Sequence, residues 1–325
     1  LKANSVRLSG KLQVLTSGDV AISGDVKYDG MLGIHQYVDS FNTEILNGGF
    51  LENIQAYPRA VKTMLLARQS DSQQGSETDK SVELRCGDDE LTKEILKGMT
   101  DNKPLPFSFT PQICLNKVVS GNLSYQHTGS VMVNMRFAPT LDIFYGVNAG
   151  GVKYAITDLQ MSYETIPDDK VKEPVTMLTN TMVRNNINSS LFQISVKVPV
   201  ECLSVSGTFI KSSNLSVTAT NNTLCEDPNV SRLEFEINDG NGYVSYPIET
   251  REEMLYNYIL ANNGVYNNAF SLKKSSADEG FGIGLFFNNS SFSFYNQKFG
   301  LSVSSDASNV VPYTLFLYFT GVITV

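Results

Sequence analysis

The two halves of this 325-residue chain contain the same succession of expected elements in the same order. Each half has a strand, a polar loop, an amphipathic helix, an apolar run rich in phenylalanine and two β-rich segments. The apolar runs are residues 107–109 and 281–287, and the strands that close the halves are residues 154–163 and 313–319. This repetition predicts two similar β-domains in tandem. A duplicated β-domain with little chemistry in it favours a structural subunit.

Alternation of apolar and polar residues predicts strands along the whole chain. The clearest cases are residues 6–14, 131–137, 192–198 and 233–237. The last of these leads into Asn238-Asp239-Gly240-Asn241-Gly242 and then into a further strand at 243–246. Glycine and asparagine tolerate the positive φ that a tight turn needs, so we interpret this segment as a hairpin turn in preference to a calcium-binding loop.

Two short helices are expected in the first half. Residues 51–66 place apolar side chains at spacings of three and four, and Pro58 is expected to kink or restart this helix. A second helix is expected at 88–99, with Asp88-Asp89 at its N-cap. The polar faces of these helices lack basic enrichment, which favours helices that cover a sheet over helices that lie on a membrane.

One helix is expected in the second half, at residues 250–261. Thr250 and Glu253 have the spacing of a capping box, in which each side chain accepts a hydrogen bond from the backbone amide of the other residue. Asn262-Asn263-Gly264 is expected to end this helix.

Composition and charge exclude several classes of protein. Hydrophobic residues make up 42% of the chain and charged residues only 18%, which suits a folded β-rich protein. The net charge is −8 and no basic run occurs, so we expect no direct sequence-specific nucleic-acid binding. No stretch reaches the roughly 20 apolar residues of a membrane-spanning helix. Residues 1–5 show no signal-peptide pattern, and residues 68–85 have mixed charges and suggest a solvated loop.

The boundary between the halves is expected at 166–174, which contains two prolines and five charged residues. We therefore predict a first domain at 1–166, a linker at 167–174 and a second domain at 175–325.

The chain contains few residues that could carry catalysis. His35 and His127 are the two histidines, and neither lies near a nucleophile motif. We interpret His127 as a hairpin-turn residue and His35 as a strand or loop residue. The acidic pairs at 88–89, 168–169 and 252–253 suit a helix cap, a linker and a first helical turn. We therefore expect no catalytic activity, no cofactor and no metal site.

The four cysteines also lack the spacing of a metal site. They are expected to be reduced and mostly buried. A disulfide between Cys202 and Cys225 could form only in an oxidising compartment. The cysteines are Cys86, Cys114, Cys202 and Cys225.

Three stretches together resemble the double jelly-roll major capsid proteins of tailless lipid-containing phages, adenovirus hexon and virophages. The first runs from GIHQY at 33–37 into FLENIQAYPR at 50–59, and the second from LPFSF at 105–109 through 131–137 to 154–163. The third joins 299–303 to the closing run at 312–323. The resemblance covers nearly the whole chain as a pattern of elements.

This resemblance implies an all-β fold of two tandem eight-stranded jelly-roll barrels with short inserted helices. It also implies a viral major capsid protein, assembled inside the host cell into pseudo-hexameric homotrimers that tile an icosahedral shell in the virion. Its expected partners are copies of itself in the trimer and in neighbouring capsomers, together with minor capsid or penton proteins. The resemblance is compatible both with the presence and with the absence of an internal membrane beneath the shell. The alternative is a carbohydrate-binding or adhesive β-sandwich protein such as a viral fibre or spike, and a β-sandwich hydrolase is the least favoured interpretation.

Overall fold

Strands dominate the computed structural model, which describes residues 1–16, 25–46, 49–68, 82–85, 95–97, 103–167, 174–198, 201–238, 243–266, 280–287, 298–305 and 311–325. The strands of the first half are β1 (Arg7–Thr16), β2 (Val38–Ile45), β3 (Gly49–Ile54), β4 (Leu105–Phe109), β5 (Val118–Ser120), β6 (Val131–Phe137) and β7 (Val152–Ser162). Those of the second half are β8 (Thr176–Ile187), β9 (Leu191–Lys197), β10 (Glu201–Lys211), β11 (Val230–Asn238), β12 (Tyr243–Ile248), β13 (Gly282–Phe286), β14 (Lys298–Ser305) and β15 (Tyr313–Thr324).

The α-helices are fewer and mostly short. They are α1 (Tyr57–Arg68), α4 (Tyr125–Thr128), α5 (Thr140–Ile143) and α6 (Arg251–Tyr266). Short 3₁₀ helices lie at Gly33–Tyr37, Cys114–Asn116, Ala149–Gly151 and Ser212–Asn214. Among the described residues, no helix has the length and apolar character needed to cross a bilayer.

The second half folds into two facing four-stranded arrays, here called the second barrel. One array has the order β13-β10-β15-β8 and the other has the order β12-β11-β14-β9, with antiparallel pairing throughout. Eight strands in this order form a jelly roll. Its core comes from inward side chains of both arrays, among them Phe209, Phe235 and Leu301.

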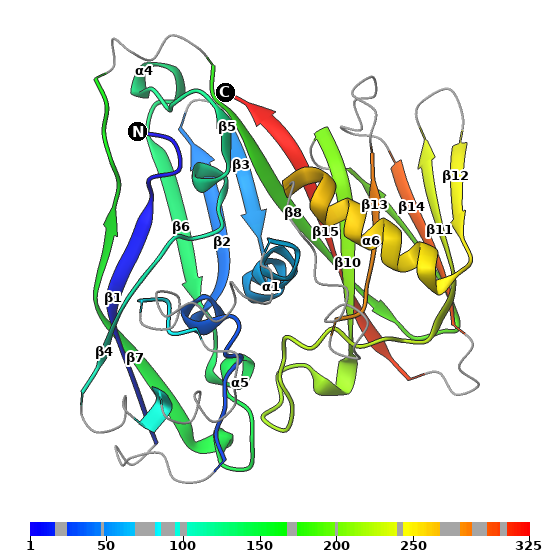
Figure 1. Ribbon diagram of the computed structural model, residues 1–325, viewed down its shortest axis with the longest axis horizontal. Coiled ribbons are helices and arrows are strands. Elements are labelled where there is room, and N and C mark those ends of the chain that lie inside the picture. Colours follow the sequence, from blue (N-terminus) through cyan, green and yellow to red (C-terminus); the bar gives the residue numbers. More distant parts are fainter. Residues whose placement is uncertain are drawn as a thin grey trace.

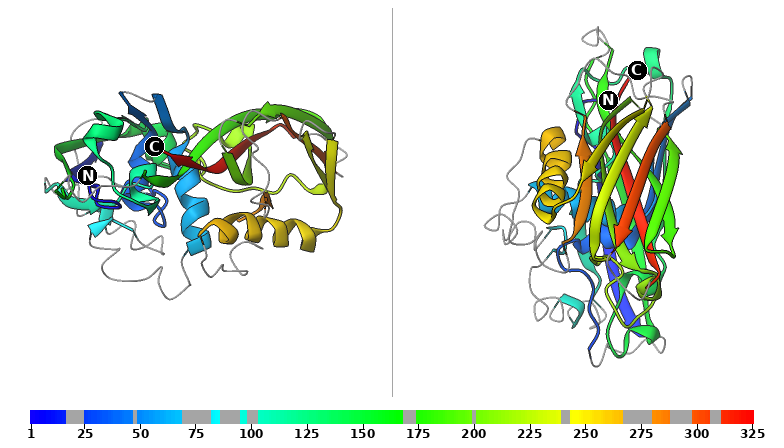
Figure 2. Two further views of the ribbon diagram at one scale, coloured as in Figure 1. Left: turned by 90° about the horizontal axis from the view of Figure 1, so that it is seen from above. Right: turned by 90° about the vertical axis from the view of Figure 1, so that its right-hand side faces the viewer.

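The first half repeats this arrangement, and is here called the first barrel. Its sheets have the orders β4-β1-β7 and β3-β2-β6, which match β13-β10-β15 and β12-β11-β14 of the second barrel. The helices match as well, because α1 follows β3 as α6 follows β12. The two barrels stand side by side with α1 and α6 on the same face (Figures 1 and 2). The expected all-β double jelly-roll fold is therefore confirmed.

Strand β15 shows why the two halves pack as one body. Nine consecutive residues from its first residue, Tyr313, are buried, and side chains of a strand point alternately to its two faces. Leu315, Leu317 and Phe319 belong to the core of the second barrel, whereas Phe316 and Tyr318 pack with the core of the first. The continuous apolar run is thus the signature of a strand that is covered on both sides.

The helix expected at 51–66 starts later than its apolar spacing indicates. Leu51 and Ile54 are buried residues of strand β3, and α1 begins at Tyr57. Pro58 lies in the first turn of α1 and does not kink it, because a first-turn residue has no intrahelical partner for its N–H group. Both faces of β3 are covered. Its buried residues Leu51 and Ile54 are therefore three positions apart, which is also the spacing of one face of a helix.

Several smaller expectations also need correction. Helix α6 continues past 262–264 and ends at Tyr266, and His127 lies in the short helix α4 and not in a hairpin turn. His35 lies in a 3₁₀ helix. Of the helix expected at 88–99, residues 95–97 are helical, and 88–94 and 98–99 lie outside the described residues.

Of the remaining expectations, one is confirmed and the others lie outside the described residues. The capping box is confirmed, with Glu253 N–H donating to Thr250 Oγ1 at 3.2 Å and Thr250 N–H donating to Glu253 at 3.4 Å. The turn residues 239–242 and the linker residues 168–173 lie outside the described residues, so the domain boundaries stay a prediction.

Helix α6 lies directly against strand β13, and glycines make this approach possible. A Cβ on Gly284 would lie 2.7 Å from the Cβ of Ala261 and 3.1 Å from the Cα of Tyr258, closer than van der Waals contact allows. We predict that Gly284→Ala lowers the free energy of unfolding by about 1–3 kcal/mol, because α6 must move away from the sheet.

Thermal unfolding of the purified protein checks this prediction. Gly150→Ala is the matched control, since nothing lies within 4 Å of a Cβ at Gly150. Equal midpoints for the two variants would contradict the close packing of α6 on β13.

Candidate functional site: the junction between the barrels

The two barrels share one sheet. In the eight-stranded sheet β13-β10-β15-β8-β3-β2-β6, strand β8 of the second barrel lies beside β3 of the first, and β5 also pairs with β8. The β3–β8 contact is parallel and has a single register pair, Asn53 with Thr181. Backbone pairing is therefore sparse at this point, and side chains must supply much of the connection.

A fully buried carboxylate makes that connection. Glu52 in β3 has no exposed surface and accepts a hydrogen bond from Lys117 Nζ at 2.7 Å, from Cys114 N–H at 2.6 Å and from Asn180 N–H of β8 at 3.0 Å. A buried carboxylate is strongly unfavourable unless it is paired and hydrogen-bonded. Lys117 and Cys114 belong to the first barrel, so the Asn180 donor is the one that requires β3 and β8 to keep their present positions.

A second buried ion pair lies beneath helix α1. Asp29 accepts a hydrogen bond from Lys62 Nζ of α1 at 2.8 Å and from two side chains of the second half, Thr223 Oγ1 and Asn221 Nδ2. Burial by itself would raise the pKa of Asp29, but the charge of Lys62 and these hydrogen bonds outweigh it and lower the pKa to about 2. Asp29 therefore stays ionised at neutral pH and ties the loop after β10 to the first barrel.

Arg59 of α1 extends the same connection. Its guanidinium group donates to the backbone carbonyls of Asn222 and Leu224 and lies over the ring of Phe316, 4.7 Å from the ring centroid. Tyr318 of β15 also donates to the carbonyl of Ala56 at 3.3 Å. Helix α1 is thus held by charged and aromatic contacts to the second barrel.

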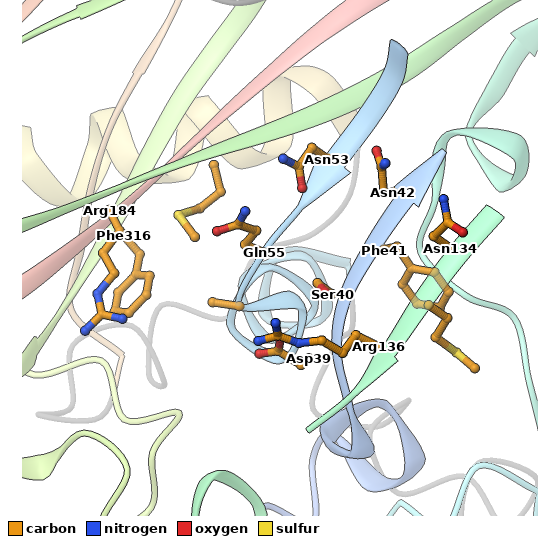
Figure 3. A pocket seen from close by; sticks show the side chains of 13 residues that line it. Asp39, Ser40, Phe41, Asn42, Asn53, Gln55, Asn134, Arg136, Arg184 and Phe316 are labelled. Atoms are coloured by element: carbon orange, nitrogen blue, oxygen red, sulfur yellow. The ribbon is translucent and has the colours of Figure 1, made fainter. Parts of the chain in front are cut away.

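A polar hollow of about 350 Å³ opens beside this junction (Figure 3). Arg184 and Phe316 come from the second barrel, and Arg136 of β6 forms an ion pair with Asp39 at 2.7 Å. The described lining has no histidine, cysteine or lysine. Its remaining polar side chains are amides and a hydroxyl, namely Ser40, Asn42, Asn53, Gln55 and Asn134. The hollow can hold water or a polar group.

The structure places His35 in the first core. The residue is 1% exposed, and Nδ1 lies 2.9 Å from the hydroxyl of Tyr57. That hydroxyl accepts a hydrogen bond from Gln112 N–H, which leaves its own proton for Nδ1. Burial and the nearby charge of Arg85 lower the pKa of His35 to about 3. His35 is therefore a neutral core residue that no substrate can reach, and the side chain of His127 lies outside the described part of the structure.

The other candidate groups lie apart from one another. Cys114, Cys202 and Cys225 are free and buried, and Cys86 lies outside the described residues. Within the described ranges, no three potential ligands gather as a metal site would need. Glu252 and Glu253 lie in the first turn of α6, and the other two acidic pairs are outside the described residues.

Sequence reasoning did not identify the junction residues. The local sequence indicates only an ordinary amphipathic strand, turn or helix around each of the residues Glu52, Asp29 and Lys62. The local sequence around Glu52 gives only a weak signal, because Leu51 precedes it and the polar Asn53 follows it.

Solved structures resemble this chain, whereas family models and curated sequences do not. No family model matches the sequence, and no curated protein matches it. Among solved structures, the Faustovirus major capsid protein is 9% identical with a TM-score of 0.56, over all of this chain and 85% of that one. PBCV-1 VP54, in a crystal structure fitted into a reconstruction of the virophage Sputnik, is 9% identical with a TM-score of 0.55, over 99% of this chain and 88% of that one. The chain therefore has the double jelly-roll fold of viral major capsid proteins.

The Glu52–Lys117 pair gives a test of the junction. We predict that Lys117→Met lowers the free energy of unfolding by about 3–5 kcal/mol, because Glu52 is left buried without its cation. The double variant Glu52→Gln with Lys117→Met should recover part of this loss. Chemical denaturation measures both.

The control for this experiment is Lys2→Met, which removes an ion pair with Glu164 whose two side chains are 50% and 64% exposed. We expect no measurable loss from this variant. A loss of similar size in both lysine variants would contradict a special role for the buried pair.

His35 gives a prediction about pH. Its folded pKa of about 3 lies below the unfolded value near 6.5, so the unfolded chain binds the proton more tightly and stability is lost as pH falls through this window. Between pH 6 and pH 4 the wild type should lose about 2 kcal/mol more than His35→Asn. Thermal unfolding across this range, with His127→Asn as the control, measures the difference. Parallel pH profiles for wild type and His35→Asn would contradict the buried neutral state.

Proposed function

We propose that this protein is the major capsid protein of an icosahedral virus, with a structural and non-enzymatic role in the virion. The observation that carries the proposal is the rigid fusion of two jelly rolls into one block. One sheet runs through both barrels, and residues of the second half donate hydrogen bonds to the buried carboxylates of Glu52 and Asp29. A shell subunit needs such a fixed shape, since its contact surfaces must repeat at the same angles around the particle.

The assembly that fits this block is a homotrimer. Two similar barrels side by side give each subunit a doubled outline, so three subunits around a threefold axis present six barrels in a nearly hexagonal ring. Such a ring packs against identical rings on a curved surface. The name of the Faustovirus neighbour, a major capsid protein with the same fold, supports this function. Minor capsid or penton proteins would then close the vertices.

The net charge of −8 agrees with a shell protein that does not bind nucleic acid directly. A shell protein can enclose a genome without reading its sequence, and direct binding to nucleic acid would need clustered basic residues. The proposed protein is assembled inside the host cell and resides in the virion.

Native mass measurement tests the assembly. We predict a species of three subunits, about 107 kDa for three chains of 35.8 kDa, with the large contacts of an obligate assembly. The trimer should persist on dilution to nanomolar concentration. A stable monomer at every concentration, from a protein whose circular dichroism shows a folded β structure, would contradict the proposed tile.

A further inference from the structure

The polar hollow beside the junction contains a row of carboxamide groups. The strand registers place Asn42 of β2 opposite Asn53 of β3 on one side and opposite Asn134 of β6 on the other. Residues directly opposite each other on antiparallel strands point to the same face of the sheet, and all three line the hollow (Figure 3). These three side chains are here called the amide row. A carboxamide both donates and accepts hydrogen bonds, so the row suits a ligand whose groups do the same.

One atom of the amide row is left without a partner. Oδ1 of Asn42 is buried and forms no hydrogen bond to any described residue, whereas Nδ2 of the same side chain donates to Glu44 at 2.6 Å. A buried acceptor without a donor is unfavourable. A ligand with a hydroxyl group would supply the missing donor.

The hollow also carries an excess of one positive charge on an acidic chain. Its described lining contains two arginines, Arg136 and Arg184, and one carboxylate, Asp39, whereas the whole chain has a net charge of −8. Arg136 forms an ion pair with Asp39. Arg184 forms no ion pair with a described residue, and its guanidinium group lies over the ring of Phe316, 5.6 Å from the centroid. This local excess of positive charge attracts an anion, and Arg184 is free to bind it.

Strand pairing and volume together favour a sugar over an extended peptide. Strand β2 is paired with both β3 and β6, and β3 is paired with both β2 and β8. The floor of the hollow therefore offers no free strand edge with which a peptide backbone could pair. Its volume of about 350 Å³ is at the lower end of the range for small-molecule sites. A sugar ring suits this site because its neighbouring hydroxyl groups donate and accept as the amides do.

We propose that the hollow at the junction binds an acidic carbohydrate, with Arg184 bound to the carboxylate of the sugar and the amide row bound to its hydroxyl groups. The chemical class is a sugar unit that bears a carboxylate, such as a uronic acid or a sialic acid. A shell subunit with this site would also attach its particle to acidic glycans. This binding goes beyond the proposed shell function, since it needs only the two barrels of one folded subunit.

Titration calorimetry of the purified protein tests the proposal, with glucuronic acid and N-acetylneuraminic acid as the two acidic probes. Glucose is the neutral counterpart of glucuronic acid. We expect at least one acid to bind about tenfold more tightly than glucose, because only the acid contacts Arg184 through a charged group. The difference should shrink as salt is added.

Two variants separate the two parts of the site. Arg184→Gln should weaken binding of the acid about tenfold and leave the affinity for glucose nearly unchanged. Asn134→Ala should weaken both, because the amide row contacts hydroxyl groups that the two sugars share. Arg232→Gln is the matched control, since Arg232 is also a half-exposed arginine on a strand but does not line the hollow. Thermal unfolding of each variant verifies that it is folded.

Three results would overturn the proposal. The wild type could bind neither acid at millimolar concentration, or it could bind glucuronic acid and glucose equally. Arg184→Gln could also bind the acid as tightly as the wild type, which would place the sugar elsewhere on the protein.

A peptide probe separates the sugar from an acidic protein segment. The probe is acetyl-Gly-Glu-Gly-amide, which carries a carboxylate but no ring hydroxyl groups. We expect it to bind more weakly than the acidic sugar. Tighter binding of the peptide, lost in Arg184→Gln, would assign the hollow to a protein partner and overturn the carbohydrate site. None of these results bears on whether the protein forms a shell, which the trimer mass decides separately.

Discussion

The buried carboxylate of Glu52 is the constraint on which the relation between the two barrels depends. Strand β3 meets β8 through a single parallel register pair, so the backbone alone holds this contact weakly. Glu52 adds a charge that is satisfied only by Lys117, by the amide of Cys114 and by the amide of Asn180 across the junction. A rotation of one barrel against the other would remove the Asn180 donor from a fully buried carboxylate, which is unfavourable.

The remaining contacts make the same block more rigid. Asp29 and Arg59 tie the loop at 221–224 to helix α1, and β15 gives its two faces to the two cores. These interactions differ in kind, since one set is ionic and the other apolar, but both join the halves at the centre of the molecule. The outer surfaces are free of these contacts, which agrees with the proposed role as a shell subunit.

The sequence predicts correctly those elements whose local pattern fits only one type of secondary structure. Strand 131–137 alternates cleanly and was located to the residue, and the capping box at Thr250 and Glu253 placed the start of α6. The apolar spacing at 51–66 predicts a helix although residues 51–54 form a strand, because a strand with two covered faces has no period of two. The ion pairs were beyond sequence reasoning, since Glu52 and Lys117 are 65 residues apart and nothing local brings them together.

Electron microscopy of the purified protein and of its source particle tests the central claim most directly. The account predicts capsomers with a nearly hexagonal outline, each with density for six barrels from three chains, arranged as an icosahedral shell. Density for the two barrels should fit as one rigid body. A chain located in a fibre or spike, or a shell in which the two barrels of one chain take several relative orientations, would contradict the account.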